Sequence, residues 1–324
     1  MEFQSYIKNA DCFDEFENIP SNSINLVLVD LPYGQTHCAW DVPLDLGQMW
    51  ESLRRIAKDN CIFVFFCTTK YGNALINSNP AFFRYDLVWQ KHIPVGFLSS
   101  NKMPLRKHEM IYIFAHIRDD LRNERNLELR QYAQKVREYI GLPYKEIKDI
   151  FGNSSMSHFY GFKNKRFGLP TEKNYKKLTE LFNLEKMQGF MPYEEMKSKW
   201  EKLKLTYNPQ KTKGKPYKRN KKRGKKNEVY NKHKYMEYAN PSGDRHPDSV
   251  LKFNRDRKSY HTTQKPLDLL EWLIKSYSNE GDLVLDFVMG SGSTIEACMN
   301  TNRRYIGIEK DEEIFLIAKN RLKL

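Results

Sequence analysis

Cysteine is scarce in this sequence, and the few cysteines have no metal-binding spacing. The 324 residues include five cysteines, with no Cys-x-x-Cys pair and no nearby histidine at the spacing of a zinc site. This pattern argues against a zinc-stabilised domain, and it predicts reduced thiols in a cytoplasmic protein that needs no metal. The five are Cys12, Cys38, Cys61, Cys67 and Cys298.

Long apolar runs are also absent. No segment reaches the length that spans a bilayer, and Met1–Ser5 lacks the basic and apolar character of a targeting signal. We therefore expect a soluble intracellular protein without a membrane partner. Hydrophobic residues make up 40% of the chain, which is enough to bury a core in one domain or in one domain with an insertion.

Acidic residues are missing from one long segment. Residues 202–226 contain twelve Lys and Arg side chains and no Asp or Glu, against a net charge of +14 for the whole chain. Such a charge predicts a polyanionic partner, although it does not by itself separate DNA from RNA or an acidic membrane. Residues 206–232, dominated by Gly, Pro, Asn and Lys, are predicted to form a loop or an arm, with a solvated linker as the alternative.

The cations of this arm are predicted to contact phosphates rather than bases. Lysine dominates the run, and lysine is a flexible point charge that suits a phosphate better than a base edge. Arginines in the same run offer the alternative of reading guanine. The candidates are Lys218, Arg219, Lys222 and Arg223.

What is present is an alternation of short apolar runs with amphipathic stretches, which predicts an α/β fold. The first part of the chain predicts strands at residues 24–29, 61–66, 85–89 and 110–114 and a helix at 46–56. The last part predicts helices at 266–276 and 294–300, strands at 283–286 and 305–308, and a final helix. We expect both parts to build one doubly wound, mainly parallel, Rossmann-like sheet.

The pattern breaks between residues 118 and 257. We expect a mostly helical insertion there, with residues 1–117 and 258–324 as the two parts of the main domain. Asn153 and Ser154 are predicted to cap one helix, and Pro170–Thr171 to start another. Around residues 159–167 aromatic and cationic residues alternate, which suits either a groove-contacting surface or ordinary packing. The candidates for nucleic-acid contact are His158, Tyr160, Lys163, Lys165 and Arg166.

One motif at a strand end is suited to activating an amine. In Asp30-Leu31-Pro32-Tyr33, the Asp30 carboxylate can accept a hydrogen bond from an exocyclic amine, and the backbone carbonyl of Leu31 can accept a second. Pro32 stiffens the turn, and Tyr33 can stack on a base. A strand-ending turn with a capping Asp is the plainer alternative.

A second motif predicts a nucleotide-like cofactor. Asp286 ends a predicted strand and a Gly-x-Gly loop leads into a helix, so that backbone amides can approach a carboxylate. The loop lacks the third glycine of a dinucleotide site, and the acidic Glu309 ends the next strand, where it can hold ribose hydroxyls. The loop candidates are Asp286, Phe287, Gly290, Ser291 and Gly292.

Taken together, these motifs resemble the beta class of DNA amino-methyltransferases, in which the amine motif precedes the cofactor motif. The resemblance covers residues 6–115 and 258–322. It implies S-adenosyl-L-methionine as the cofactor, double-stranded DNA as the substrate, adenine N6 of a flipped-out base as the target, and a homodimer. It also implies that the insertion is the target-recognition domain.

Three further segments carry the resemblance. Asn9–Cys12 looks like the segment whose Asp contacts the cofactor adenine, Arg106–Glu109 looks like a base-pocket segment, and His261–Pro266 looks like the helix-opening motif that covers the cofactor. The cofactor-binding residues that it implies, besides the glycine loop and Glu309, are Asp11, Cys12, Asp30, Thr263, Lys265 and Pro266.

One departure leaves alternatives open. The family usually has Pro at the position of Leu31, although the catalytic carbonyl belongs to the backbone and survives the change. Asp30 rather than Ser favours adenine N6, with cytosine N4 as the alternative. A catalytically silent nucleic-acid-binding protein of the same fold and an enzyme acting on RNA are the other readings.

Overall fold

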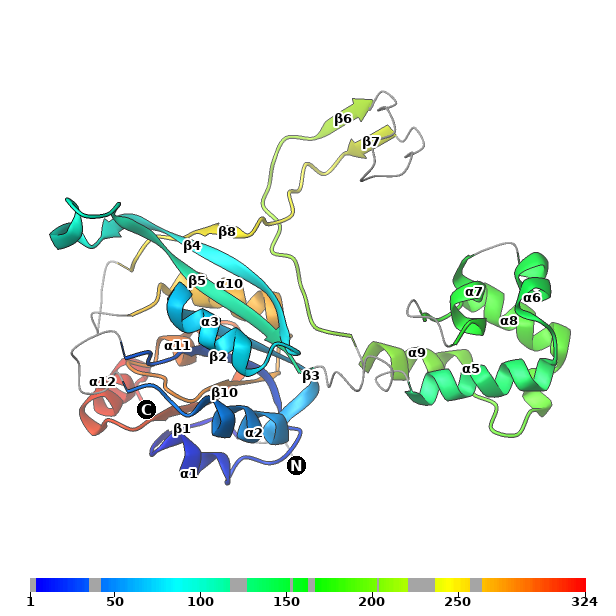
Figure 1. Cartoon of the computed structure of the whole chain (residues 1–324), viewed down its shortest axis with the longest axis horizontal. Helices are drawn as coiled ribbons and strands as arrows, with labels where there is room; N and C mark the ends of the chain where they lie inside the picture. The colour runs from blue at the N-terminus through cyan, green and yellow to red at the C-terminus, as the bar shows by residue number, and fades with distance from the viewer. Residues whose placement is uncertain are drawn as a thin grey trace.

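A mainly parallel sheet forms the body of the protein in this computed structural model (Figure 1). The structure describes residues 4–34, 42–116, 127–151, 154–162, 167–202, 204–220, 237–256 and 264–324. Across the sheet the strands are β1 (Tyr6–Asn9), β10 (Arg304–Glu309), β9 (Leu283–Asp286), β2 (Ile24–Asp30), β3 (Ala57–Cys67), β5 (Arg106–Ala115), β4 (Phe83–Val95) and β8 (Val250–Lys252). Of these strands, β5 alone runs against the others, which confirms the predicted sheet.

The central strands are apolar along their whole length because both faces of the sheet are covered. On one face Val27, Val29 and Phe63 join a core with α1 (Cys12–Phe16), α2 (Leu46–Ile56) and α3 (Thr69–Ser78). On the other face Leu26 and Leu28 join a core with α10 (Leu267–Tyr277) and α11 (Ser293–Asn300). The last helix, α12 (Glu312–Leu322), packs at the edge beside β10.

The two ends of the chain meet in the middle of the sheet. β2 pairs in parallel with β9, with Leu26 opposite Val284 and Val27 opposite Leu285. Parallel neighbours end at the same edge of a sheet, so Asp30 and Asp286 both lie at the carboxyl edge, where α/β folds bind ligands. The prediction that distant halves build one sheet is confirmed.

Local signals placed several elements correctly. Helix α2 has the predicted bounds, and the Asp45 side chain caps it by accepting from the amide of Gln48. β4 and β5, in contrast, are longer than predicted, because they continue as a two-stranded ribbon beyond the sheet. That part of the ribbon contains many polar residues, so the apolar runs at 85–89 and 110–114 mark only the part inside the core.

The helical part of the insertion has a core of its own. It consists of α5 (Leu127–Ile140), α6 (Tyr144–Phe151), α7 (Ser154–Tyr160), α8 (Glu172–Phe182) and α9 (Tyr193–Lys202), with a short 3-10 turn at Leu184–Lys186 after α8. A second 3-10 turn, Phe97–Ser99, lies outside the insertion, between β4 and β5. Thr171 caps α8 as predicted, whereas the predicted cap Asn153 lies outside the described residues. No helix in the described ranges is long and apolar enough to cross a membrane.

The end of the insertion differs from the prediction in two respects. Residues 206–232 were predicted to form a loop or an arm, and part of this segment is a strand: β6 (Tyr217–Asn220) pairs antiparallel with β7 (Glu237–Asn240) in a ribbon that projects away from the sheet (Figure 1). β8 lies inside the predicted range 118–257, yet it pairs with β4 as the edge strand of the main sheet. β6 and β8 are held by hydrogen bonds to partner strands that lie apart in the sequence, and neither strand has a strong apolar run that would have predicted it.

A glycine in α3 makes room for an aromatic ring. A Cβ placed on Gly72 would lie 2.2 Å from the buried ring of Tyr112. Glycine costs about 1 kcal/mol inside a helix relative to alanine, so close packing is the reason for its presence.

We expect Gly72→Ala to lower the free energy of unfolding by about 1–3 kcal/mol, because the overpacking exceeds the gain in helix propensity. Urea unfolding measures this. Gly168→Ala is the control, since its Cβ would meet nothing closer than 4.0 Å. Equal stabilities of the two variants would contradict the packing argument.

Candidate active site

The glycine loop joins β9 to α11 at the carboxyl edge of the sheet. Asp286 ends β9 and is 3% exposed, and its Oδ1 accepts a hydrogen bond from the Val288 amide at 3.3 Å. Gly290 and Gly292 have φ of 52° and 78°, a region that favours glycine, and Gly292 is the residue that precedes α11. Burial raises the pKa of the Asp286 carboxyl to about 7. Hydrogen bonds from Thr294 and Val288 act in the opposite direction but do not outweigh burial.

Glu309, at the end of β10, ties the loop to the next helix. Its Oε2 accepts from the Gly290 amide at 2.9 Å, and its Oε1 accepts from the Asp311 amide at 2.9 Å. Burial raises the pKa of Glu309, and the backbone hydrogen bonds oppose the rise. On the adjacent side Lys310 forms an ion pair with Asp11, 2.9 Å from Nζ to Oδ2, where Asp11 caps α1.

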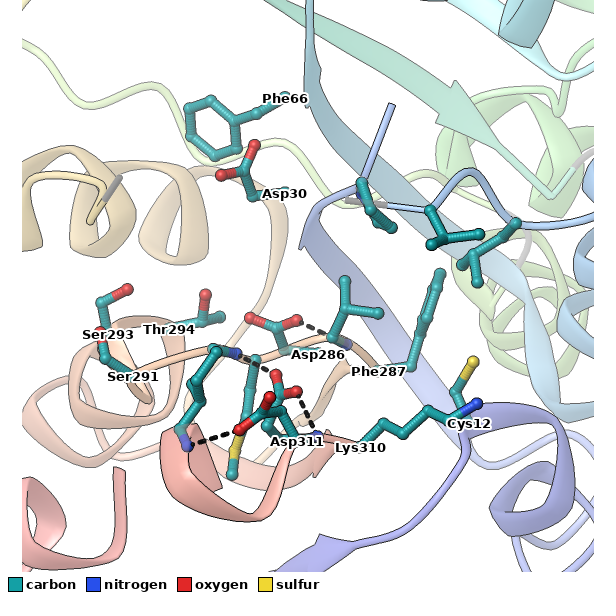
Figure 2. Close-up of a pocket in the computed structure, with 18 of the residues that line it drawn as sticks. Cys12, Asp30, Phe66, Asp286, Phe287, Ser291, Ser293, Thr294, Lys310 and Asp311 are labelled. Atoms are coloured by element: carbon teal, nitrogen blue, oxygen red, sulfur yellow. Dashed lines mark hydrogen bonds between the residues drawn. The ribbon is translucent and has the colours of Figure 1, made fainter. Parts of the chain in front are cut away.

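These groups line a cavity of about 560 Å³. Figure 2 shows Asp30 beside Phe66 at one end of it, with Asp286 between them and the glycine loop. The size suits a cofactor with a base, a sugar and an amino-acid part. Most of the predicted catalytic and cofactor-binding residues line it, namely Asp11, Cys12, Asp30, Pro32, Lys265, Asp286, Phe287, Gly290, Ser291 and Glu309.

Asp30 reaches the cavity from the end of β2 and forms an ion pair with Lys265. The same ammonium lies 3.1 Å from Oε1 of Glu109, and the other oxygen of Glu109 lies 2.7 Å from Nζ of Lys91. Two carboxylates and two ammonium groups therefore alternate along a row whose inner members, Lys265 and Glu109, are buried. Asp30 Oδ1 is buried without a hydrogen-bond partner in the described residues.

Burial and pairing compete in this row. Burial raises the pKa of Asp30 most strongly, and the Lys265 ammonium opposes the rise. Burial also acts to raise the pKa of Glu109, but Lys265 and Lys91 together outweigh it, so that pKa is lowered. Both carboxylates raise the pKa of Lys265 above its usual value despite its burial. Lys265 is the cation shared by the two acids, and it favours the charged form of each.

Several predicted site residues lie elsewhere. The Leu31 side chain is 1% exposed in the core below the sheet edge, so only its backbone is available to the site. Tyr33 is half-buried, with its ring 5.9 Å from the ring of Tyr71. Pro266 precedes α10, and Gly292 packs toward α12, so neither lines the cavity. Thr263 lies outside the described residues.

The predicted nucleic-acid contacts are only partly placed. Tyr160 was a wrong prediction, because its side chain is fully buried in the helical core and its hydroxyl donates to the Leu142 carbonyl at 2.9 Å. His158 is half-buried, and Lys218 is exposed on β6. Arg219 belongs to β6, but its side chain is not described. Lys163, Lys165, Arg166, Lys222 and Arg223 lie outside the described residues.

Sequence reasoning missed three contributors to the site. Glu109 belonged to the segment identified as a base pocket, but its ion pair with Lys265 spans 156 positions and had no local signal. Phe66 ends a predicted strand level with Asp30, so its position at the cavity was open to prediction from the parallel register. Lys310 directly follows Glu309, and its pairing with Asp11 requires β1 beside β10.

The fold and the cavity define a class: an α/β enzyme with a nucleotide-like cofactor site and a carboxylate at its rim. The family model described as DNA methylase (N6_N4_Mtase) matches residues 24–320, so this chain belongs to that family. The PvuII DNA methyltransferase, described as cytosine-N4-specific, superposes over 99% of this chain and 87% of its own, with TM-score 0.50 and 12% identity. That likeness shows the fold.

Curated relatives match over shorter segments. The type II methyltransferase M.HpaI from Haemophilus parainfluenzae is 45% identical over 87 residues, which cover 27% of this chain and 27% of the relative. M.HindIII from Haemophilus influenzae is 43% identical over 72 residues, which cover 22% of this chain and 23% of the relative. The matched segments thus span about a quarter of each relative's length.

The ion-pair row predicts a pH-dependent loss of stability in Lys265→Met. We expect the free energy of unfolding to fall by roughly 3–5 kcal/mol at pH 8, because two buried carboxylates lose their shared cation. The folded-state pKa of Asp30, already raised by burial, then rises further, and that of Glu109 rises above its unfolded value, so the loss shrinks as pH falls toward 5 and the acids become protonated. Urea unfolding at both pH values measures it.

Lys275→Met is the matched control. Lys275 pairs with Glu271 at 3.0 Å near the end of α10, but its side chain is 43% exposed. Exposed pairs contribute about 0–1 kcal/mol. The role assigned to Lys265 would be contradicted if Lys265→Met lost as little free energy of unfolding as the control, or if its loss did not depend on pH.

Proposed function

We propose that this chain transfers a methyl group from S-adenosyl-L-methionine to adenine N6 in double-stranded DNA. The observation that carries the proposal is the position of Asp30. It lies at the rim of a cofactor-sized cavity with one carboxylate oxygen paired to Lys265 and the other buried without a hydrogen-bond partner among the described residues. A buried unpaired acceptor is costly, and an incoming amine donor would satisfy it.

The residues at the rim suit an amine substrate. An exocyclic amine is a weak nucleophile because its lone pair is delocalised into the ring. Asp30 Oδ1 accepts one amine hydrogen and the Leu31 carbonyl accepts the other, which localises the lone pair on nitrogen. The buried Leu31 side chain anchors that carbonyl, and Pro32 lines the cavity wall. In the proposed mechanism Tyr33 would stack on a base extruded from the duplex.

The cavity residues fit S-adenosyl-L-methionine, which supplies an electrophilic methyl group when bound. Glu309 would hold ribose hydroxyls, Asp11 and Phe287 would surround the adenine, and backbone amides near Gly290 would approach the carboxylate. Acidic side chains outnumber cations around the cavity, which complements a positively charged sulfonium. A Cβ on Gly290 would meet nothing within 4 Å and would extend into this space.

Cytosine N4 is the second candidate target. The matched family model covers N6 and N4 methylases alike, and both amines need the same activation. Asp at position 30 favours adenine. Mass analysis of nucleosides from methylated DNA decides between the two, and cofactor binding without methyl transfer would instead identify a silent nucleic-acid-binding protein.

DNA contacts outside the catalytic site complete the proposal. The helical insertion recognises the target sequence, and the cationic arm around β6 contacts phosphates through exposed lysines such as Lys218. Because lysine dominates the arm, its role is affinity rather than sequence choice. The resemblance to the family extends the proposal to a homodimer in the cytoplasm.

The first functional prediction concerns Asp30. Replacing it with Ala should lower the rate of methyl transfer by about a hundred-fold or more, because a preorganised acceptor of the amine is lost. The affinity for the cofactor in calorimetry should change little. Tritiated methyl transfer to unmethylated genomic DNA measures the rate, and near-wild-type turnover would remove Asp30 from the mechanism.

The glycine loop is predicted to be needed for cofactor binding. Gly290→Val should weaken cofactor binding by at least about ten-fold, since the added side chain enters the cavity. Gly281→Val is the control, because Gly281 has a φ of 78° and open space around its Cβ but lies in the turn before β9, away from the cavity. It carries comparable backbone strain without obstruction. Equal affinities of the two variants in calorimetry would place the cofactor elsewhere.

A further inference from the structure

The end of the β4–β5 ribbon exposes an unusual amount of apolar surface. Leu98 is 100% exposed and Phe97 is 79% exposed, both in the 3-10 turn between the strands. We call residues 91–108 the hairpin tip. Large apolar side chains there are all exposed, namely Ile93, Val95, Phe97, Leu98, Met103 and Leu105. Exposed apolar clusters of this kind mark interaction surfaces.

The hairpin tip is also free of acidic residues. Between Asp86 and Glu109 the chain contains Lys91, Lys102, Arg106 and Lys107, together with two histidines, and no Asp or Glu. Lys91 is paired with Glu109, whereas Lys102 and Lys107 are exposed. The tip therefore combines an apolar end with a segment of net positive charge, which complements a polyanion with an apolar interior.

Strand register places the hairpin tip on the same side of the sheet as the cavity. Asp30 lies level with Phe66, Phe66 with Ile111, and Ile111 with Leu87 on β4. β4 runs parallel to β2 and continues to Val95, so it extends up to about 25 Å past that level at the rise of a strand. Figure 1 shows the ribbon passing beyond the sheet and ending in the short turn.

The ribbon is anchored in the catalytic site. Glu109 at its base contacts Lys265, which pairs with Asp30, and Lys91 on the opposite strand contacts Glu109. The geometry thus holds the tip at a defined distance from the rim carboxylate. Within the described residues no further layer covers the end of this ribbon, and a two-stranded ribbon has little stability of its own. A partner surface would account for its apolar end.

We propose that the hairpin tip enters duplex DNA, with Phe97 and Leu98 wedging between base pairs beside the base that reaches Asp30. This inference rests on the proposed function, because the tip would open the duplex for the base that is methylated at Asp30. Apolar wedges that unstack a base step are an established mode of DNA deformation. A second copy of this chain fits less well, because a twofold interface would bring acid-free, cationic tips together.

The first experiment detects contact without relying on catalysis. A benzophenone amino acid is placed at position 97, and at position 299 as the control. Met299 is 41% exposed at the carboxyl end of α11, which lies at the sheet edge opposite the cavity. Irradiation with a random-sequence duplex should crosslink position 97 to DNA and leave position 299 uncrosslinked. A crosslink from position 97 to a second protein chain, or none to DNA, overturns the proposal.

The second experiment separates base opening from chemistry. Phe97→Ser/Leu98→Ser should reduce methyl transfer to duplex genomic DNA by at least about ten-fold, because unstacking loses its wedge. Transfer to the same DNA after heat denaturation should change less than about two-fold, because single-stranded DNA needs no opening. Met299→Ser is the matched control and should behave as wild type on both substrates.

The outcomes distinguish this proposal from the proposed function. Equal losses on duplex and denatured DNA, or no loss on either, overturn the wedge. Wild-type protein that methylates neither substrate overturns the proposed function, whereas crosslinking at position 97 still decides whether the tip contacts DNA. A double variant that sediments at a lower mass than wild type and methylates both substrates normally identifies a copy-to-copy surface instead.

Discussion

The parallel pairing of β2 with β9 is the constraint on which the rest of this structure depends. It places residues 24–30 beside residues 283–286 and aligns their carboxyl ends at one sheet edge. The amine-activating group and the cofactor loop come from opposite ends of the chain, and this pairing makes them one cavity. Insertion of a helical domain between them is tolerated because its own core makes it independent of the sheet.

Electrostatics then shapes the cavity that the pairing creates. Asp30, Asp286 and Glu309 are acids in one partly buried space, and burial raises the pKa of each. Lys265 offsets this at one end by pairing with both Asp30 and Glu109. Among the described residues one oxygen of Asp30 has no hydrogen-bond partner, which is unfavourable for stability and, in the proposed function, leaves this oxygen available to an amine donor.

In the proposed function, three outward-facing surfaces contact different parts of the DNA. The helical insertion, the β6–β7 ribbon and the hairpin tip are separate elements attached to one rigid sheet (Figure 1). Cations on the β6–β7 ribbon suit phosphates, whereas the exposed apolar turn at Phe97 and Leu98 suits the stacked bases. Because these surfaces are attached to the sheet that carries Asp30, a duplex that they bind would be held in a fixed position relative to the catalytic site.

The sequence by itself determined the elements whose signals are local. The apolar run before Asp30, the capped helix α2 and the strand, loop and helix around Asp286 follow from patterns within a few residues. Family motifs identified ten of the 26 residues that line the cavity. Only the tertiary structure decided which charges meet, that Tyr160 is core rather than surface, and that the β4–β5 ribbon leaves the sheet with its apolar end exposed. These outcomes depend on strand register and on contacts between residues far apart in the chain, such as Glu109 and Lys265, for which a linear pattern carries no signal.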